Sequence, residues 1–178
     1  MPGSWGITPR ESVRGECESR GEDAVVAGCL DILTGRNVDE RLLRVLAGPA
    51  AEQVLDGREG GTAGYWPRVW ATRGLLYAWN ERATATVVLA VSDEAWRVRE
   101  MAAKVIARHR IDDGLGAVIR LSGDPVPRVR RAAQRAIAVL TEAAALAPSA
   151  SPSRSSMSPR SRAAIGAASG CPESMARW

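Results

Sequence analysis

Apolar residues recur at steps of three and four along most of the chain, the spacing that places side chains on one face of an α-helix. In the clearest case, Val129, Ala133, Ala136, Ile137 and Leu140 form one continuous stripe. Shorter stripes of the same kind begin near residue 22 and residue 39. The pattern therefore predicts an all-α protein whose helical domain covers residues 21–145.

Residues 65–145 also repeat themselves. A shift of 31 residues places the segment from Asp93 (DEAWRVREMAAKVIA) on the segment from Asp124 (DPVPRVRRAAQRAIA), and a fainter copy begins at Pro67, 29 residues before its counterpart. Each unit is predicted to be a pair of helices. One pair cannot bury its apolar stripe alone, so neighbouring units must stack to close a core. We expect Asp124 to cap a helix whose first residue is Pro125, because a missing amide donor costs nothing there.

Three segments lack such a stripe. Residues 1–20 are polar and contain Gly, Pro and Ser, so we expect a poorly ordered lead-in. Residues 57–64 hold four glycines and are predicted to form a loop. Residues 146–178 are rich in Ser, Ala, Pro and Arg with one acid, Glu173, a composition typical of a low-complexity, disordered tail.

The repeated units resemble the HEAT repeat, in particular the short HEAT-like repeats of bacterial proteins. The signature is carried by DPVPRVRRAAQRAI from Asp124, and more faintly by the copy from Asp93, which has Glu94 and Trp96 in place of the two prolines. The resemblance implies a short right-handed α–α superhelix of the armadillo type, capped by the N-terminal helices. The units would then cover residues 65–92, 93–123 and 124–145.

The resemblance also implies a structural ladder, because Asp and Arg side chains of successive HEAT units tend to pair along the stack. The positions that match are Asp93, Arg99, Asp124 and Arg130. The HEAT fold hosts many activities, so the resemblance specifies the fold far better than the function.

The composition suits packed helices, and the charge is unevenly distributed along the chain. Ala, Val and Leu dominate the apolar residues, while Phe is absent and Trp outnumbers Tyr by six to two, which suits close-packed helices. Residues 1–60 carry 7 Arg and 11 acids, net −4, whereas residues 61–178 carry 17 basic residues and 9 acids, net +8. Such an asymmetry can steer a charged partner, although the charge of solvated helix faces also varies without that role.

Two groups of side chains are candidates for an interaction surface. Trp66 and Trp70 are four residues apart and share a helix face, which Tyr77 can join. The second group is basic and consists of Arg97, Arg128, Arg131 and Arg135, of which Arg97 is the counterpart of Arg128 one unit earlier. The plain alternatives are rings buried in the core for the first group and a solvated polar face for the second.

No cluster in the sequence points to catalysis, a cofactor or a metal ion. His109, the only histidine, ends a basic helix and is interpreted as a cation near a helix C-terminus. Segment 57–64 lacks the Lys-Ser/Thr ending of a phosphate-binding loop, and no serine stands in a nucleophile-elbow motif. Three cysteines without metal-ligand spacing fit a reducing compartment. With no signal-peptide or membrane-spanning stretch, we expect a cytoplasmic protein that does not engage membranes.

Three functions remain open. A non-enzymatic scaffold or adaptor that binds another protein needs nothing beyond the fold. Nucleic-acid binding is supported by the basic C-terminal half and by DNA-glycosylase relatives of the HEAT fold. An accessory or lyase-like role, by analogy with HEAT-like lyase subunits that attach bilin pigments, has no catalytic set to support it. The oligomeric state is not indicated by the sequence.

Overall fold

A computed structural model describes residues 6–146, and it describes their side chains up to residue 142. Over this range the chain forms nine α-helices and no β-strand, which confirms the all-α prediction for the described residues. In chain order the α-helices are α1 (Pro9–Arg20), α2 (Glu22–Leu33), α3 (Glu40–Ala47), α4 (Ala51–Leu55), α5 (Tyr65–Gly74), α6 (Thr84–Ala90), α7 (Trp96–His109), α8 (Leu115–Leu121) and α9 (Pro127–Leu146). Short 3₁₀ helices join them: η1 (Gly48–Ala50), η2 (Arg58–Ala63), η3 (Glu81–Ala83) and η4 (Asp112–Gly114).

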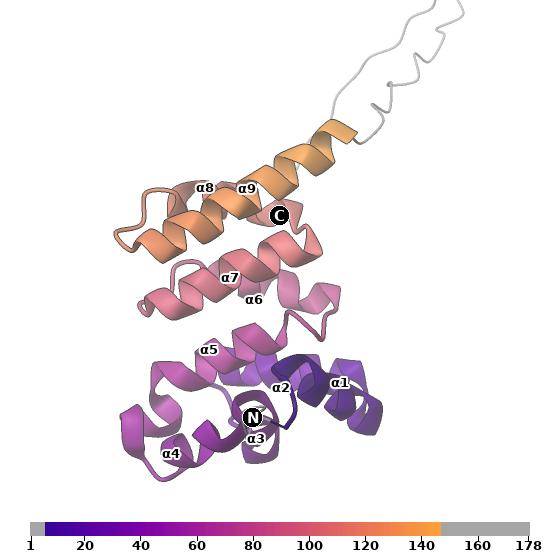
Figure 1. Cartoon of the computed structure of the whole chain (residues 1–178), viewed down its shortest axis with the longest axis vertical. Helices are drawn as coiled ribbons and strands as arrows, with labels where there is room; N and C mark the ends of the chain where they lie inside the picture. The colour runs from indigo at the N-terminus through magenta and orange to yellow at the C-terminus, as the bar shows by residue number, and fades with distance from the viewer. Residues whose placement is uncertain (1–5, 147–178) are drawn as a thin grey trace, which may run out of the picture. The chain divides into compact units, whose positions relative to one another are not determined.

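Helices α5, α7 and α9 lie side by side in one layer (Figure 1). Helix α6 packs against α7, and α8 packs against α9, so these two shorter helices form a second layer behind the first. Helices α2 and α3 pack against α5, and α1 packs against both of them. The buried side chains form one cluster that runs from Val13 to Leu140, as expected for a stack in which each pair of helices completes the core of its neighbour.

Helix α1 corrects the prediction of a poorly ordered lead-in over residues 1–20 for the part from Pro9 to Arg20, while residues 1–5 lie outside the described residues. Its polar sequence fully buries only Val13 and Glu16, and Cys17 packs partly buried against the core, but its N-terminus carries a complete capping box. Thr8 Oγ1 accepts the amide of Glu11 at 3.3 Å, and the Glu11 carboxylate accepts the amide of Thr8 at 2.8 Å. Arg20 then ties the end of the helix to Asp39 at 2.8 Å. Capping and ion pairs therefore order a segment with a weak apolar stripe.

The turns before α7 and α9 have the same construction, and they correct the predicted start of the last helix. Asp124 does not cap a helix that begins at Pro125; its Oδ1 accepts the amide of Val126 at 2.8 Å, and α9 begins at Pro127. The equivalent Asp93 accepts the amide of Ala95 at 2.8 Å, ahead of α7. Each aspartate therefore shapes a two-residue turn, and Pro127 rather than Pro125 occupies the first helical position.

Small residues set the spacing between the helices. Ala102, Ala103, Ala133 and Ala136 are fully buried. Gly74 ends α5 against the core, where an added Cβ would lie 2.6 Å from Leu46 Cδ2 and 3.2 Å from Cys29 Sγ. Close approach of the backbones there depends on the absence of side-chain bulk.

The predicted tail, residues 146–178, lies outside the described residues except for Leu146, the last residue of α9. Among the described helices, none combines the length and the apolar character needed to cross a membrane.

Candidate binding face

The repeat period explains why certain side chains line up on the layer of α5, α7 and α9. Arg68 on α5 bonds Asp93, and Arg99 on α7 bonds Asp124 in the same way, so Arg68 is the counterpart of Arg99. The shift between α5 and α7 is therefore 31 residues, and the offset of 29 suggested by the fainter copy is wrong. With a shift of 31, one row of equivalent positions holds Trp66, Arg97 and Arg128, and a second row holds Arg73, Lys104 and Arg135.

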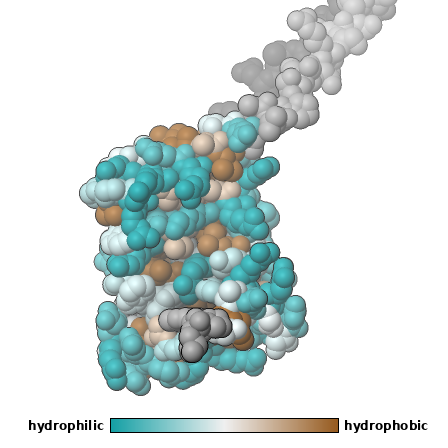
Figure 2. Space-filling model, viewed as in Figure 1, coloured by the Kyte–Doolittle hydropathy of each residue, from teal (hydrophilic) through white to brown (hydrophobic). Residues whose placement is uncertain are grey.

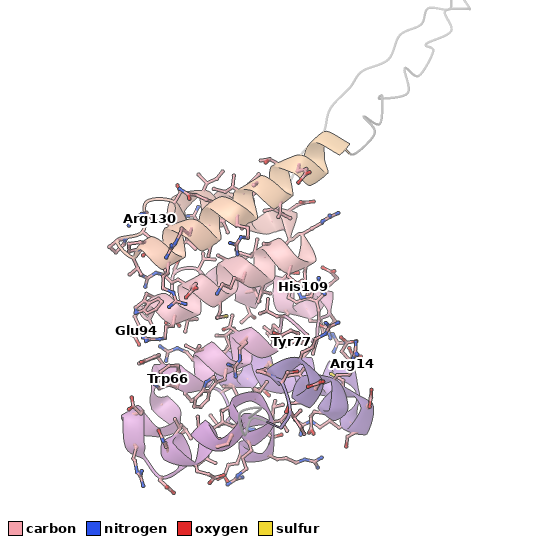
Figure 3. The ribbon with its side chains drawn as sticks, in the orientation of Figure 1. Arg14, Trp66, Tyr77, Glu94, His109 and Arg130 are labelled. Atoms are coloured by element: carbon pink, nitrogen blue, oxygen red, sulfur yellow. The ribbon has the colours of Figure 1, made fainter. Side chains whose placement is uncertain are left out.

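Together with Trp70 and Trp96, the first row forms a continuous chain of rings and guanidinium groups, of which Figure 3 labels Trp66. The Trp66 and Trp70 rings stack with centroids 5.7 Å apart and an interplanar angle of 22°. The Arg97 guanidinium carbon lies 5.1 Å from the ring centroid of Trp66 and 4.4 Å from that of Trp96. Arg128 lies 5.6 Å from the same Trp96 ring. The structure thus brings together the two groups of candidate residues, which the sequence treats as separate.

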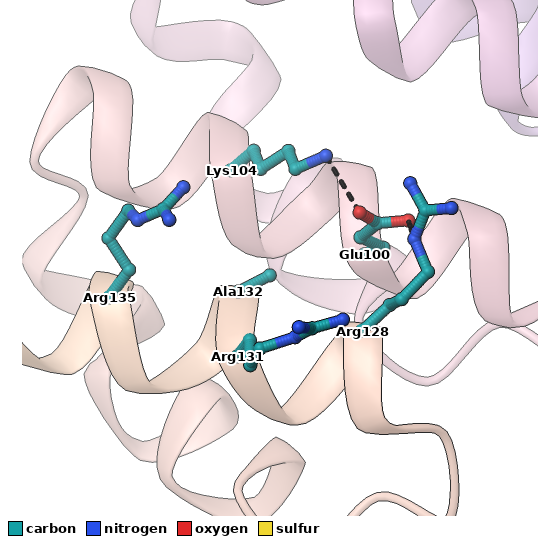
Figure 4. A pocket seen from close by; sticks show the side chains of 6 residues that line it. All are labelled: Glu100, Lys104, Arg128, Arg131, Ala132 and Arg135. Carbon is teal, nitrogen blue, oxygen red and sulfur yellow. Dashed lines mark hydrogen bonds and ion pairs between the residues drawn. The ribbon is translucent and has the colours of Figure 1, made fainter.

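Between α7 and α9 the surface is hollowed into a groove, which we call the basic groove. Two adjoining hollows of about 340 and 450 Å³ share Lys104, Ala132 and Arg135 among their lining residues. The cationic residues that line them are Lys104, Arg108, Arg110, Arg128, Arg131 and Arg135. Figure 4 shows one of these hollows, with arginines of α9 on one side and Glu100 and Lys104 of α7 on the other.

Glu100 is the only carboxylate among the residues that line the groove. Its side chain is 8% exposed, and its oxygens lie 2.8 Å from Lys104 Nζ and 3.6 Å from Arg128 Nε. Arg131 and Arg135 are exposed and pair with no carboxylate among the described residues. Since the one negative charge is buried and already paired, the groove presents an excess of positive charge to solvent.

The surface over these helices is mainly hydrophilic, with smaller hydrophobic patches among the hydrophilic areas (Figure 2). This arrangement matches the plain alternatives from the sequence, buried rings and a solvated polar face, only in part. Trp70 is buried, with 7% of its surface exposed, but Trp66 is half-buried and contributes to the surface. The arginines are solvated, yet they gather in a groove and against aromatic rings instead of spreading over the helices.

The aspartates and arginines of the repeats lie on the edge of this face and connect successive helices. Arg99 donates to Asp124 through Nε at 2.7 Å and through Nη2 at 3.2 Å, and its Nη1 donates to the carbonyl oxygens of Asp93 and Glu94. The Arg99 hydrogen bonds, ahead of other causes, lower the pKa of the Asp124 carboxyl group. Arg130 repeats the backbone contacts of Arg99, to the carbonyl oxygens of Asp124 and Pro125, but has no aspartate beyond it among the described residues. These four residues hold the turns in place.

A second aromatic cluster lies at the other end of α5, and the sequence did not indicate it. Tyr77 does not join Trp66; it lies near His109 and Arg14, as Figure 3 shows. The His109 ring stacks on Trp79 at 4.4 Å and its Nε2 donates to the carbonyl oxygen of Leu75 at 2.8 Å. Burial is the main cause that lowers the pKa of His109, so the residue is largely neutral at pH 7 and not the cation expected near a helix end.

The described residues offer no group of three or more His, Cys, Asp or Glu side chains that could hold a metal ion. Cys29 is buried, and burial raises the pKa of its thiol to about 12, which makes it a core residue without thiolate reactivity. What the α5–α7–α9 face can offer chemically is therefore positive charge, guanidinium forks and aromatic edges, which are binding groups.

Comparison with known families supports the resemblance noted in the sequence. Residues 115–144 match the model of the HEAT repeat, which places the match on α8 and nearly all of α9. The chain therefore contains a HEAT repeat, a helical pair that in stacked arrays presents a surface for interaction. Searches among curated proteins and among solved structures found no match.

Proposed function

We propose that the protein is a non-catalytic scaffold that binds an acidic segment of another protein on the α5–α7–α9 face, with the basic groove as the main contact. The observation that carries the proposal is the charge of the groove, where six cationic side chains surround a single, buried and paired carboxylate. Stacked helical repeats bind partners along such extended surfaces. Arg131 and Arg135 lie on one helix, four residues apart, and can each bond a carboxylate through two N–H groups.

Nucleic acid is the second candidate, because the same cations can contact phosphates. Single-stranded nucleic acid also requires ring faces on which bases stack. On this face the rings already contact groups of the protein: Trp66 contacts Trp70 and Arg97, and Trp96 contacts Arg97 and Arg128. This use of the rings favours a protein partner over a nucleic acid.

A charge-reversal experiment tests the proposal. The variant Arg131→Glu/Arg135→Glu reverses the charge of two exposed arginines on α9 that line the groove and have no carboxylate partner among the described residues. The matched control is Arg82→Glu/Arg120→Glu, which makes the same change of net charge at two exposed arginines on η3 and α8, outside the residues that line the groove. Tagged wild-type protein and both variants are used to capture partners from host lysate, with and without nuclease, followed by mass spectrometry.

We expect proteins that survive nuclease treatment, bind the wild type and the control, and are lost with the groove variant. Since each exposed charge contact at an interface rim changes binding modestly, the loss for two reversals together should be about tenfold or more, including the new repulsion. Partners that bind the groove variant as well as the wild type would contradict the proposal. If the captured proteins disappear on nuclease treatment, the groove binds nucleic acid instead of a protein.

A further inference from the structure

A small hollow adjoins the aromatic end of the α5–α7–α9 face, and we call it the tryptophan hollow. Its lining residues come from η1, α4, η2 and α5 and are Ala50, Gln53, Val54, Glu59, Trp66 and Trp70. Its volume is about 230 Å³. Binding pockets for small molecules range from about 300 to 1,000 Å³, so this hollow suits a single side chain better than a whole ligand. Two indole rings, Ala50 and Val54 make its walls apolar, which selects an apolar side chain.

The hollow connects with the basic groove through the row of rings and guanidinium groups. The links from Trp70 to Trp66, to Arg97, to Trp96 and to Arg128 measure 5.7, 5.1, 4.4 and 5.6 Å. Followed end to end, this path is about 21 Å, which an extended peptide covers with about six residues. One short segment of a partner can therefore reach both places without leaving the surface.

The two ends of the path differ in charge. Glu59 is the only charged residue that lines the tryptophan hollow, whereas the basic groove is lined by six cations. An acidic residue of a partner is repelled at the first end and attracted at the second. Arg97 stands between them, held by its contacts with the Trp66 and Trp96 rings, and supplies a guanidinium group for the middle of the segment.

We propose that the partner's segment is bipartite, with one bulky apolar side chain in the tryptophan hollow and a group of acidic residues about six positions away in the basic groove. This inference rests on the proposed function, which requires only the acidic part. It adds the chemical pattern by which the partner is recognised: an apolar anchor followed or preceded, at a fixed spacing, by acidic residues. The anchor gives affinity through burial of apolar surface, and the charges set orientation and register.

Defined peptides test the pattern without knowledge of the natural partner. The probe is a fluorescein-labelled peptide with one Leu separated by five Ser or Gly residues from four consecutive Glu residues, made in both chain directions. One matched peptide has Ala in place of Leu, and another has Gln in place of each Glu. Their affinities for the full-length protein are measured by fluorescence anisotropy at low and at high salt.

In at least one direction the Leu peptide should bind about tenfold or more tightly than the Ala peptide, because burial of one Leu side chain contributes that much affinity. The variant Gln53→Trp, made at an exposed position that lines the hollow, should remove this preference and leave the affinity of the Ala peptide unchanged. The Arg131→Glu/Arg135→Glu variant should weaken both peptides by the same factor and leave the preference for Leu intact.

The outcomes separate the two proposals. Equal affinity of the Leu and Ala peptides for the wild type in both directions would refute the bipartite pattern, and the comparison needs no variant. If both still bind more tightly than the Gln peptide, the acidic partner of the proposed function stands. If the Gln peptide binds as well as the others, the proposed function fails and the bipartite pattern fails with it. A preference for Leu that persists in Gln53→Trp would place the anchor elsewhere and overturn the assignment of the hollow.

Discussion

Replacement of Asp124 by alanine should destabilise the helical stack strongly, because this carboxylate connects α7 to the turn before α9. Asp124 is 8% exposed and accepts hydrogen bonds from Arg99 Nε at 2.7 Å and from the Val126 amide at 2.8 Å. The Arg99 side chain is only 15% exposed, so water cannot fully replace the hydrogen bonds that it loses with Asp124. Removal of one member of a buried ion pair costs about 3–5 kcal/mol of the free energy of unfolding.

The lower part of that range, about 3 kcal/mol, is expected here, because Arg99 keeps its bonds to the carbonyl oxygens of Asp93 and Glu94. The assay is urea unfolding of the full chain at pH 7, followed by circular dichroism. Asp124→Asn keeps an acceptor for the Val126 amide and should lose less than Asp124→Ala. The control Arg128→Ala removes a more exposed contact, 3.6 Å from Glu100, and should cost less than about 1 kcal/mol.

The double variant Arg99→Ala/Asp124→Ala completes the test. If the pair acts as a unit, the cost of the double variant is smaller than the sum of the two single costs by about 1 kcal/mol or more. A loss below about 1 kcal/mol for Asp124→Ala, or full additivity of the two single variants, would refute the reasoning that this pair holds successive units together.

Four further results are expected. As the pH falls below about 4, the difference in free energy of unfolding between wild type and Asp124→Asn should shrink. The pKa of Asp124 is lowered in the folded protein, so its carboxylate stabilises the fold above the pKa of the unfolded chain and loses this effect at lower pH. Urea unfolding from pH 7 to pH 2 measures the difference, and a constant difference would contradict the prediction. Thr8→Ala should remove about 1 kcal/mol from α1 alone, seen as faster hydrogen exchange in residues 9–20 and unchanged exchange in α9. Gly74→Ala should lower the free energy of unfolding by about 1–3 kcal/mol in urea, because its Cβ would meet Leu46 and Cys29; an unchanged midpoint would show that the core yields easily. By NMR, His109 should show a pKa below its usual value of 6.5. Its contribution to the free energy of unfolding should decrease as the pH falls from 6.5 toward the pKa of the folded protein, because protonation favours the unfolded chain. His109→Gln should abolish this part of the pH dependence.

The fold class and the helical repeat could be predicted because both follow from the spacing of the apolar residues. Val129, Ala133 and Leu140 are buried as their stripe requires. Helix α1 could not be predicted from the spacing of apolar residues because it contributes little apolar surface to the core. Its signal was polar: Thr8 and Glu11 have the spacing of a capping box, and this pattern is visible in the sequence.

The start of α9 could not be located from caps alone. Two prolines, Pro125 and Pro127, are both compatible with a first helical position. The choice depends on Asp124, whose side chain bonds the amide two residues on and so inserts a turn before the helix. Tertiary contacts with Arg99 stabilise that turn, and such long-range contacts are absent from a local pattern.

The composition of the candidate face was predicted only in parts. Arg97 and Arg128 were identified as equivalent, but the offset of 29 residues for the first unit hid the fact that Trp66 occupies the same position on α5. The offset of 31 shown by the Arg68–Asp93 contact places all three in one row. Tyr77 was assigned to the wrong cluster because α5 ends at Gly74, after which helical spacing no longer applies.

The central claim, that the α5–α7–α9 face binds an acidic segment of a protein, is tested most directly by site-specific photo-crosslinking in the native host. Arg135 in the basic groove, and Arg120 on α8 in a control protein, are each replaced by benzoylphenylalanine, and crosslinked peptides are identified by mass spectrometry. The account predicts protein crosslinks at position 135 to peptides rich in Asp and Glu, and none of these peptides at position 120. The same peptides crosslinked from position 120, or crosslinks from position 135 only to nucleic acid or to peptides without acidic residues, would contradict it.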